Sequence, residues 1–388
     1  MRVLFASLRN TSHFYPLVPF LKACRAQGHE VAVAAPNDLR EQVEKAGATL
    51  LPVAHPGDEG LRPLWMRMRE LPEADRNRFV IGEIFAGMCA RSALPSHLEI
   101  ITSWKPELIM RESQEYASLV VAEKLGIPHV RAGITTRSTE LPIFSPAGEA
   151  MDKLRASLGM PLDTDASCIR NEPVLTLFPQ SFDDTPSPAP TLRFRAERSA
   201  TPPPLSDYWK DGSQAPFVYL SFGTVAGGID MLQSAYRTAL EAVSTLPIRV
   251  LLTIGAELPL EALGAVPRNV HVERFVPQDD VLPHASAMFC HGGSGSVIGA
   301  LATGVPLVVK PFFADQPNNA QKVQALGTGL ALGTGNASAA DMREAVRRVL
   351  DEPAFRSVAR RIAAEIAELP PVSAAPQALA ELARKARS

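Results

Sequence analysis

Cysteine is scarce in this chain, and an excess of charge of one sign and long hydrophobic runs are missing altogether. The four cysteines are far apart and form no Cys-x-x-Cys pair, which argues against a structural zinc site or a disulfide framework and suits a reducing compartment. Lys and Arg number 39 and Asp and Glu 41, for a net charge of −2, so no basic field attracts nucleic acid or an anionic membrane. No apolar stretch approaches the roughly 18 residues of a membrane helix, and the N-terminus lacks the layout of a signal peptide. These absences predict a cytoplasmic protein with no nucleic-acid partner and no integral membrane segment.

What the sequence does contain is typical of a globular enzyme-sized protein. The 388 residues suit two domains of about 100–200 residues each. The hydrophobic fraction is 46% and the charged fraction 21%, both ordinary for folded proteins. Proline is the exception, because residues 142–204 hold 11 of the 34 prolines. We expect irregular structure there, with a linker close behind it.

Short apolar strands alternate with amphipathic helices on both sides of this proline-rich region. The expected strands are 2–7, 30–34, 48–53, 107–110 and 129–132 in the first half, and 217–222, 249–254, 270–275, 287–290 and 305–309 in the second. This alternation with short links implies parallel βαβ units. The sequence therefore predicts an α/β protein with two Rossmann-like domains, residues 1–200 and 216–370, a linker at 201–215 and a C-terminal helix in 371–388.

A glycine-rich turn follows the expected strand that ends at Cys290. The sequence His291-Gly-Gly-Ser-Gly-Ser296 then opens a helix. Glycines allow close approach of the backbone, and a helix N-terminus offers free N–H groups with a partial positive charge. Hydroxyls of Ser294 and Ser296 and the ring of His291 add donors, so the pattern predicts a phosphate site, although a turn without a ligand gives the same pattern.

The longer stretch around this turn, Phe275 to Val323, resembles the donor-binding signature of family 1 nucleotide-sugar-dependent glycosyltransferases. The matching elements are Pro277-Gln278, His284, His291-Gly292-Gly293, Gly295-Ser296, Ala300-Leu301, Gly304-Val305-Pro306, Pro311, Asp315-Gln316 and Asn319-Ala320. The resemblance, which is closest to enzymes that tailor natural products and antibiotics, implies the GT-B fold. In that fold two Rossmann-like domains face a cleft, and C-terminal helices cross back to the first domain.

The same resemblance implies a role for each matching position. His291, Gly293, Ser294, Gly295 and Ser296 would hold the donor diphosphate, with Ser221, Gly223 and Thr224 approaching it from the other side. Phe275 would stack on the base, Val276 and Gln278 would contact the nucleoside, and Asp315 and Gln316 would bind sugar hydroxyls. One position departs from the pattern: Gly299 stands where the family often has a Glu for the ribose hydroxyls. That change opens the case for a TDP-sugar beside a UDP-sugar.

His13 is the candidate general base. It follows the first strand in a His-x-x-Pro pattern that the family shares, and a neutral imidazole can remove a proton from a hydroxyl near pH 7. A helix-terminal His that merely caps is the plainer interpretation. Glu112, at the end of the strand 107–111, is the candidate carboxylate that orients the imidazole, with Glu115 in reserve.

These expectations define an inverting glycosyltransferase that needs neither a metal nor a cofactor besides its nucleotide-sugar donor. The resemblance implies domain 1–200 as the acceptor domain and 216–370 as the donor domain. The acceptor partner would be a hydroxyl of a small lipophilic natural-product aglycone. Apolar residues within 62–91 are compatible with such an acceptor, although a core stripe beside a charged helix face looks the same. A monomer and a homodimer are equally compatible with the sequence.

Other functions stay open at this point. A sugar-nucleotide 2-epimerase of the same fold would need several acidic groups in its cleft, and a lipid-linked sugar transferase an exposed apolar patch on the first domain. Gly299 and the altered loop 9–12 would fit a non-catalytic partner, although intact His13 and Asp315-Gln316 count against it. A nicotinamide dehydrogenase fits the Rossmann units, but the loop after the first strand lacks glycine and so lacks a G-x-G-x-x-G fingerprint.

Overall fold

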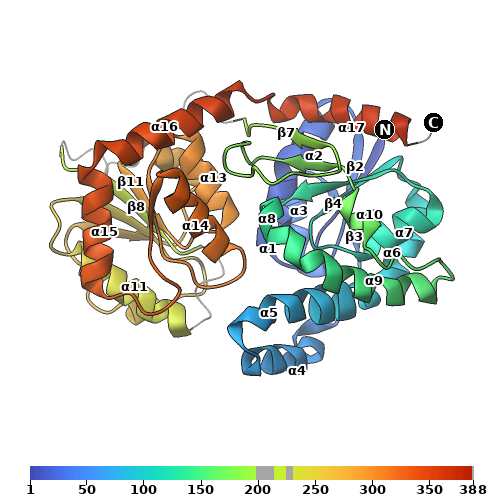
Figure 1. The fold of residues 1–388 in the computed structure, drawn as a ribbon, viewed down its shortest axis with the longest axis horizontal. Helices are drawn as coiled ribbons and strands as arrows, with labels where there is room; N and C mark the ends of the chain where they lie inside the picture. The colour runs from blue at the N-terminus through green and yellow to red at the C-terminus, as the bar shows by residue number, and fades with distance from the viewer. Residues whose placement is uncertain (198–213, 224–229, 387–388) are drawn as a thin grey trace. The chain divides into compact units, whose positions relative to one another are not determined.

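A computed structural model describes residues 1–197, 214–223 and 230–386. The chain divides into two compact units: unit 1 comprises Met1–Glu197 with Leu369–Ser388, and unit 2 comprises Arg198–Glu368. Most of the expected linker, and Thr224 with it, lies outside the described residues. Each unit is a parallel sheet covered by helices (Figure 1), which confirms the predicted class of two Rossmann-like domains.

Unit 1 is built on a seven-stranded sheet with the order β3-β2-β1-β4-β5-β6-β7. The strands are β1 (Arg2–Ala6), β2 (Glu30–Ala35), β3 (Thr49–Pro52), β4 (Leu108–Glu112), β5 (His129–Gly133), β6 (Val174–Thr176) and β7 (Thr191–Arg193). All of these neighbours pair in parallel. The order reverses between β1 and β4, and such a switch point leaves a crevice at the carboxyl ends of the two strands.

Prolines interrupt the first of the helices of unit 1. It is divided into α1 (Thr11–Phe14), the 3-10 turn η1 (Tyr15–Leu17) and α2 (Val18–Ala26), because Pro16 and Pro19 cannot donate helix hydrogen bonds. The others are η2 (Asn37–Leu39), α3 (Arg40–Lys45), α4 (Gly57–Glu70), α5 (Glu73–Phe79), η3 (Val80–Cys89), α6 (Ala90–Trp104), α7 (Ala117–Leu125), α8 (Arg137–Glu140), η4 (Leu141–Ile143), α9 (Phe144–Ser157), α10 (Ser167–Arg170), η9 (Val372–Ala374) and α17 (Ala375–Lys385). Residues 142–197 are therefore more regular than their proline content suggests.

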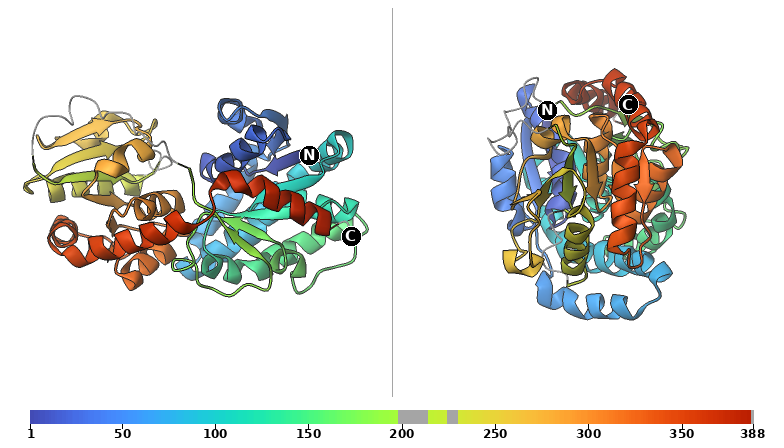
Figure 2. Two further views of the ribbon diagram at one scale, coloured as in Figure 1. Left: turned by 90° about the horizontal axis from the view of Figure 1, so that it is seen from above. Right: turned by 90° about the vertical axis from the view of Figure 1, so that its left-hand side faces the viewer.

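The last helix of the chain belongs to unit 1. Leu379 and Ala375 of α17 join the apolar core of that unit with Phe20 and Leu21 of α2, and the views in Figure 2 place α17 beside the sheet of this unit. A parallel bridge between Arg195 and Pro371 attaches the returning chain just before this helix.

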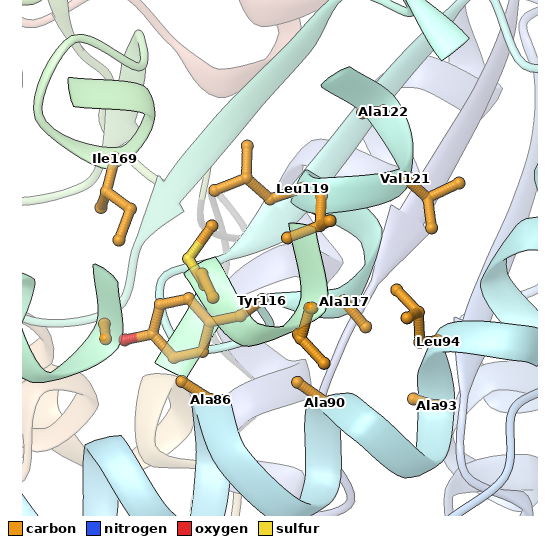
Figure 3. Packing of buried hydrophobic residues seen from close by; sticks show 14 of the residues in the cluster. Ala86, Ala90, Ala93, Leu94, Tyr116, Ala117, Leu119, Val121, Ala122 and Ile169 are labelled. Atoms are coloured by element: carbon orange, nitrogen blue, oxygen red, sulfur yellow. The ribbon is translucent and has the colours of Figure 1, made fainter. Parts of the chain in front are cut away.

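The second core cluster of unit 1 anchors the start of α7. Small side chains of η3 and α6, among them Ala86 and Ala90, allow close packing against Tyr116 and Ala117 (Figure 3). Because α7 begins just after β4, this packing fixes the turn that follows Glu112. The ten residues of η3 form a π-helix, an uncommon geometry that often marks functional sites.

Unit 2 is a six-stranded parallel sheet with the order β10-β9-β8-β11-β12-β13. Its strands are β8 (Phe217–Ser221), β9 (Arg249–Thr253), β10 (Val270–Glu273), β11 (Ala287–Cys290), β12 (Leu307–Val309) and β13 (Gly329–Ala331), the last of which was not expected from the sequence. The helices are α11 (Asp230–Val243), η7 (Leu260–Leu263), α12 (Gln278–Val281), η8 (Leu282–His284), α13 (Ser294–Ala302), α14 (Gln316–Leu326), α15 (Ala339–Asp351) and α16 (Pro353–Glu368). The switch point lies between β8 and β11. Within the described parts of the chain, no helix has the length and apolar character needed to cross a membrane.

Candidate active site

The switch point of unit 1 brings His13 and Glu112 together. Ala6 at the end of β1 pairs with Arg111 at the end of β4, so the segments that follow the two strands meet at one edge. His13 Nδ1 lies 3.2 Å from Oε1 of Glu112, whose side chain is fully buried while that of His13 is 12% exposed. A buried carboxylate against one ring nitrogen, with the ring itself partly accessible, is the arrangement that a histidine base requires.

Both partners of this pair are held from outside it. Oε2 of Glu112 accepts a hydrogen bond of 2.7 Å from the backbone N–H of Gln114, and Oε1 accepts a longer one of 3.4 Å from Leu8. The ring of Phe85, from η3, packs edge to face on the imidazole of His13 with 5.6 Å between ring centroids. We call His13, Glu112 and Phe85 the base site. Sequence analysis did not assign a role to Phe85.

Glu115, the reserve carboxylate, has its hydrogen bonds at the start of α7. It accepts hydrogen bonds from the backbone N–H groups of Ala117 and Ser118 at the start of α7, and it lies 3.2 Å from Nε2 of His97. Burial raises the pKa of Glu115, but His97 and Ser118 outweigh burial and hold the pKa below its usual value. The side chain of His97 is buried on α6 against this carboxylate.

In unit 2 the second switch point carries the glycine-rich turn. Cys290 of β11 pairs with Ser221 of β8, and His291 follows directly. A Cβ at Gly293 would fall 2.5 Å from Nε2 of His291, and one at Gly223 would fall 2.9 Å from the same atom. Glycine is therefore needed on both sides of the imidazole. Burial lowers the pKa of His291 to about 4 in spite of a contact with the backbone of Ser221, so the ring is neutral at pH 7.

The turn leads into α13, with Gly293 in extended conformation at its N-cap and Ser294 as its first residue. The first N–H groups of this nine-residue helix and the ring of His291 are the donors from which the sequence predicts an anion site. Ser294 Oγ also donates a hydrogen bond of 2.6 Å to Oδ2 of Asp315. The amide of Asn319 on α14 donates to the same Oδ2 at 3.0 Å and to Oγ of Ser294 at 3.2 Å. The residues expected to hold diphosphate and sugar are thus joined in one network.

The side chain of Gln316 is hydrogen-bonded to the loop that precedes α14. Its Oε1 accepts hydrogen bonds from the backbone N–H groups of Phe312 and Phe313, at 2.9 and 3.2 Å. Ala314 in the same loop has a positive φ of 57°, which is unusual for a residue with a Cβ. The loop that presents Asp315 is therefore tightly specified by its own contacts.

The expected nucleoside contacts lie on the segment that leads into α12, and Gln278 is the first residue of that helix. Phe275 is 68% exposed, an unusual state for a phenyl ring and one that leaves its face accessible. Gln278 donates through Nε2 to the carbonyl of Gly295 at 3.2 Å, which ties this segment to the first turn of α13. Val276 is partly buried.

Comparison with known proteins agrees with this geometry. Residues 22–188 match the family model described as erythromycin biosynthesis protein CIII-like, N-terminal domain, and residues 237–382 match the corresponding C-terminal domain. The chain belongs to this family. L-demethylnoviosyl transferase of Streptomyces niveus is 31% identical over 385 residues, which span 98% of each chain. The protein is thus a glycosyltransferase.

Solved structures give the same fold. Glycosyltransferase SnogD from Streptomyces nogalater is 28% identical, with a TM-score of 0.78 over 99% of each chain. Spinosyn rhamnosyltransferase SpnG complexed with thymidine diphosphate is 22% identical, with a TM-score of 0.81 over 98% of this chain and 100% of that one. These likenesses confirm the GT-B fold of this glycosyltransferase. They do not favour the dehydrogenase or the non-catalytic partner.

In this glycosyltransferase the residues missed by sequence reasoning are those that act through contacts across the fold. Asn319 was recognised only as part of the motif, although its amide joins three groups of the donor half. Phe85 was noted only within the apolar stretch 62–91. The apolar cluster there combines Leu61, Leu64, Trp65, Phe79, Ile84, Phe85, Met88 and Cys89. A contact of one of its members with His13 has no signature in local periodicity.

Proposed function

We propose that this glycosyltransferase moves a sugar from a thymidine-diphosphate donor to a hydroxyl of a small lipophilic natural-product aglycone, with inversion at the anomeric carbon. The observation that carries the proposal is the pairing of His13 Nδ1 with the buried carboxylate of Glu112 at 3.2 Å. The N-terminus of α13, with the neutral ring of His291 beside it, supports the proposal as the place for the donor diphosphate. Acceptor activation is assigned to unit 1 and donor binding to unit 2.

His13 is the general base in this proposal. The N–H at Nδ1 faces the carboxylate of Glu112, which fixes the ring tautomer that leaves a lone pair on Nε2. Nε2 takes the proton of the acceptor hydroxyl as its oxygen attacks the anomeric carbon. Glu112 then stabilises the imidazolium that forms. The new C–O bond forms on the face opposite the diphosphate, whose bond to the sugar breaks, and this accounts for inversion.

The leaving diphosphate is stabilised by groups of unit 2. N–H groups of Gly293, Ser294, Gly295 and Ser296 at the helix N-terminus are the assigned donors, together with the ring N–H of His291. Because His291 is neutral, it acts as a hydrogen-bond donor and not as a charge. Ser221, Gly223 and Thr224 are assigned to the other side of the diphosphate. These donors supply charge stabilisation without a metal, so transfer is expected to persist in EDTA.

The remaining donor contacts are assigned to the base and the sugar. Phe275 stacks on thymine, with Val276 and Gln278 against the nucleoside, and Asp315 and Gln316 bind sugar hydroxyls. A deoxyribose has no 2′-hydroxyl to bind, and Gly299 offers no carboxylate for one. This position therefore favours TDP over UDP.

Calorimetry tests the donor half first. TDP, UDP and NAD are titrated without metal into the wild-type protein and into His291→Ala. Micromolar binding of TDP that is lost in the variant supports the proposal, and binding of NAD alone contradicts it. The acceptor half is then tested with a panel of TDP-deoxysugars and aglycones chosen from the relatives' names, such as aklavinone, tylactone and 10-deoxymethynolide. His13→Ala should abolish transfer while TDP still binds. Light scattering of the same samples distinguishes a monomer from a homodimer.

A further inference from the structure

A fully buried arginine lies directly beside Glu112 in the sequence. Arg111 is the next-to-last residue of β4 and has no exposed surface, and its Nη1 donates to three backbone carbonyls at the end of the strand and in the following turn. These belong to Glu112 at 3.1 Å, Ser113 at 3.0 Å and Glu115 at 2.9 Å. One guanidinium nitrogen thereby closes the turn from which the Glu112 side chain projects.

The other nitrogens of Arg111 bind a carboxylate far along the chain. Nε lies 3.0 Å from Oε1 of Glu172, and Nη2 contacts Oε2, so the pair is bidentate. Nδ1 of His129 also lies 3.0 Å from Oε1. Burial raises the pKa of Glu172, but Arg111 and His129 outweigh burial and hold the pKa at about 2. The carboxylate is therefore charged at pH 7.

A buried ion pair of this kind is a costly way to stabilise a sheet, since both charges lose their water. What the pair provides is a fixed orientation. The guanidinium of Arg111 is held on one side by Glu172 and on the other by the turn carbonyls. The guanidinium also lies over the ring of Tyr116, 5.6 Å from its centroid. The guanidinium of Arg111, which donates to the carbonyl of Glu112, is thus held on three sides.

We propose that Arg111 and Glu172 are positioning residues that hold Glu112 at hydrogen-bonding distance from His13. The inference rests on the proposed function, in which Glu112 orients the base. Neither residue touches a substrate in this proposal. Their effect on catalysis passes through the placement of one carboxylate.

Two variants, which we call the brace variants, distinguish a positioning role from a purely structural one. Glu172→Gln keeps the shape of the side chain and removes the charge that fixes Arg111. The double variant Arg111→Met, Glu172→Leu removes both charges together, which buried pairs tolerate far better than the loss of one partner. Arg155→Met, Glu123→Leu is the matched control, because that ion pair also lies in unit 1 and has no described contact with the turn after β4.

The first measurement needs no substrate. In protein labelled with ¹⁵N-histidine, the His13 Nδ1–H signal, assigned with His13→Ala, reports the contact of Nδ1 with the carboxylate of Glu112. We expect this signal to shift or vanish in both brace variants and to stay unchanged in the control. An unchanged His13 signal in a folded double variant overturns the proposal.

The second measurement uses the donor and aglycone pair that turns over in the panel above. A carboxylate displaced by about 1 Å predicts a loss of about 100-fold in kcat, with the affinity for TDP unchanged. In a Glu112→Gln background the brace variants should cause no further loss. An equal loss in both backgrounds shows a general defect and overturns the proposal. Retention of transfer by His13→Ala would instead contradict the proposed function, whatever the brace variants do.

Discussion

A Cβ atom at position 299 would fall 1.8 Å from Nε2 of Gln278. The side chain of Gln278 occupies the space beside α13 that a residue larger than glycine would take at this position. Gly299→Ala should therefore displace Gln278 from its hydrogen bond to Gly295. The loss of one such contact, worth about 1 kcal/mol, predicts a several-fold weaker affinity for TDP by calorimetry. In a Gln278→Ala background, the same change at position 299 should leave the affinity unaltered, and an equal loss there would contradict the steric account.

Two neighbouring carboxylates should respond oppositely to the same substitution. Glu112→Gln removes the group that orients His13, so kcat should fall by about 10³–10⁴-fold with little change in unfolding free energy. Glu115→Gln breaks a buried pair with His97 and should lower the unfolding free energy by about 3–5 kcal/mol. Steady-state kinetics and urea denaturation of both variants check the assignment. Glu115 would replace Glu112 as the orienting carboxylate if the two effects were exchanged.

Phe85 restricts the ring of His13 by an edge-to-face contact. Truncation by Phe85→Ala removes an interaction worth about 0.5–1.5 kcal/mol, which predicts a decrease in kcat of up to about tenfold. Phe79→Ala is the matched control, because Phe79 belongs to the same apolar cluster. A similar decrease in both variants would show that the whole cluster, and not the ring contact, matters.

Asn319 joins the parts of the donor half that were expected to act separately. It is fully buried, and its amide donates to Oγ of Ser294, Oδ2 of Asp315 and the carbonyl of Gly292. Asn319→Ala removes a donor from each of these three acceptors, although Ser294 Oγ still donates to Oδ2 of Asp315, and this predicts a loss of about 1–3 kcal/mol in unfolding free energy. The KM for the donor sugar should rise with it. Gln321→Ala, at an exposed position of the same helix, should change neither quantity in denaturation and kinetic assays.

His291 makes the stability of unit 2 depend on pH. Its pKa is about 4 in the folded protein against 6.5 for an unperturbed histidine. Between these values the unfolded chain binds the extra proton, so the unfolding free energy falls as pH decreases from 6.5 to 4, by about 3 kcal/mol in all. Urea denaturation at pH 7 and pH 4.5 measures this change. His291→Gln should show a smaller difference between the two pH values, and an unchanged difference would assign the effect to other groups.

The sequence predicts what depends on local pattern and misses what depends on distant contacts. The strand ends at Cys290 and Glu112 follow from short apolar runs, and the glycine-rich turn at His291 follows from its composition. The buried pair of Arg111 and Glu172 joins residues 61 positions apart, and no periodicity signals it. The buried contact between His97 and Glu115 has no local pattern for the same reason, since the two residues come from different parts of the chain. The prolines of 142–197 suggested irregular structure, but Pro142 and Pro146 lie in the first turns of η4 and α9, and Pro173 and Pro190 directly precede β6 and β7, where a missing N–H does little harm.

Because the chain leaves unit 1 at Glu197 and re-enters it at Leu369, unit 2, to which donor binding is assigned, is an insertion within unit 1. A fragment that stops at Glu197 would lack α17, whose Ala375, Leu379 and Ala383 complete the apolar core around α2. Chimeric enzymes that exchange donor specificity between relatives therefore need two junctions, one on each side of 198–368. A hybrid with one junction would pair the C-terminal helix of one parent with the core of the other, and its yield of folded protein would fall before its specificity could be measured.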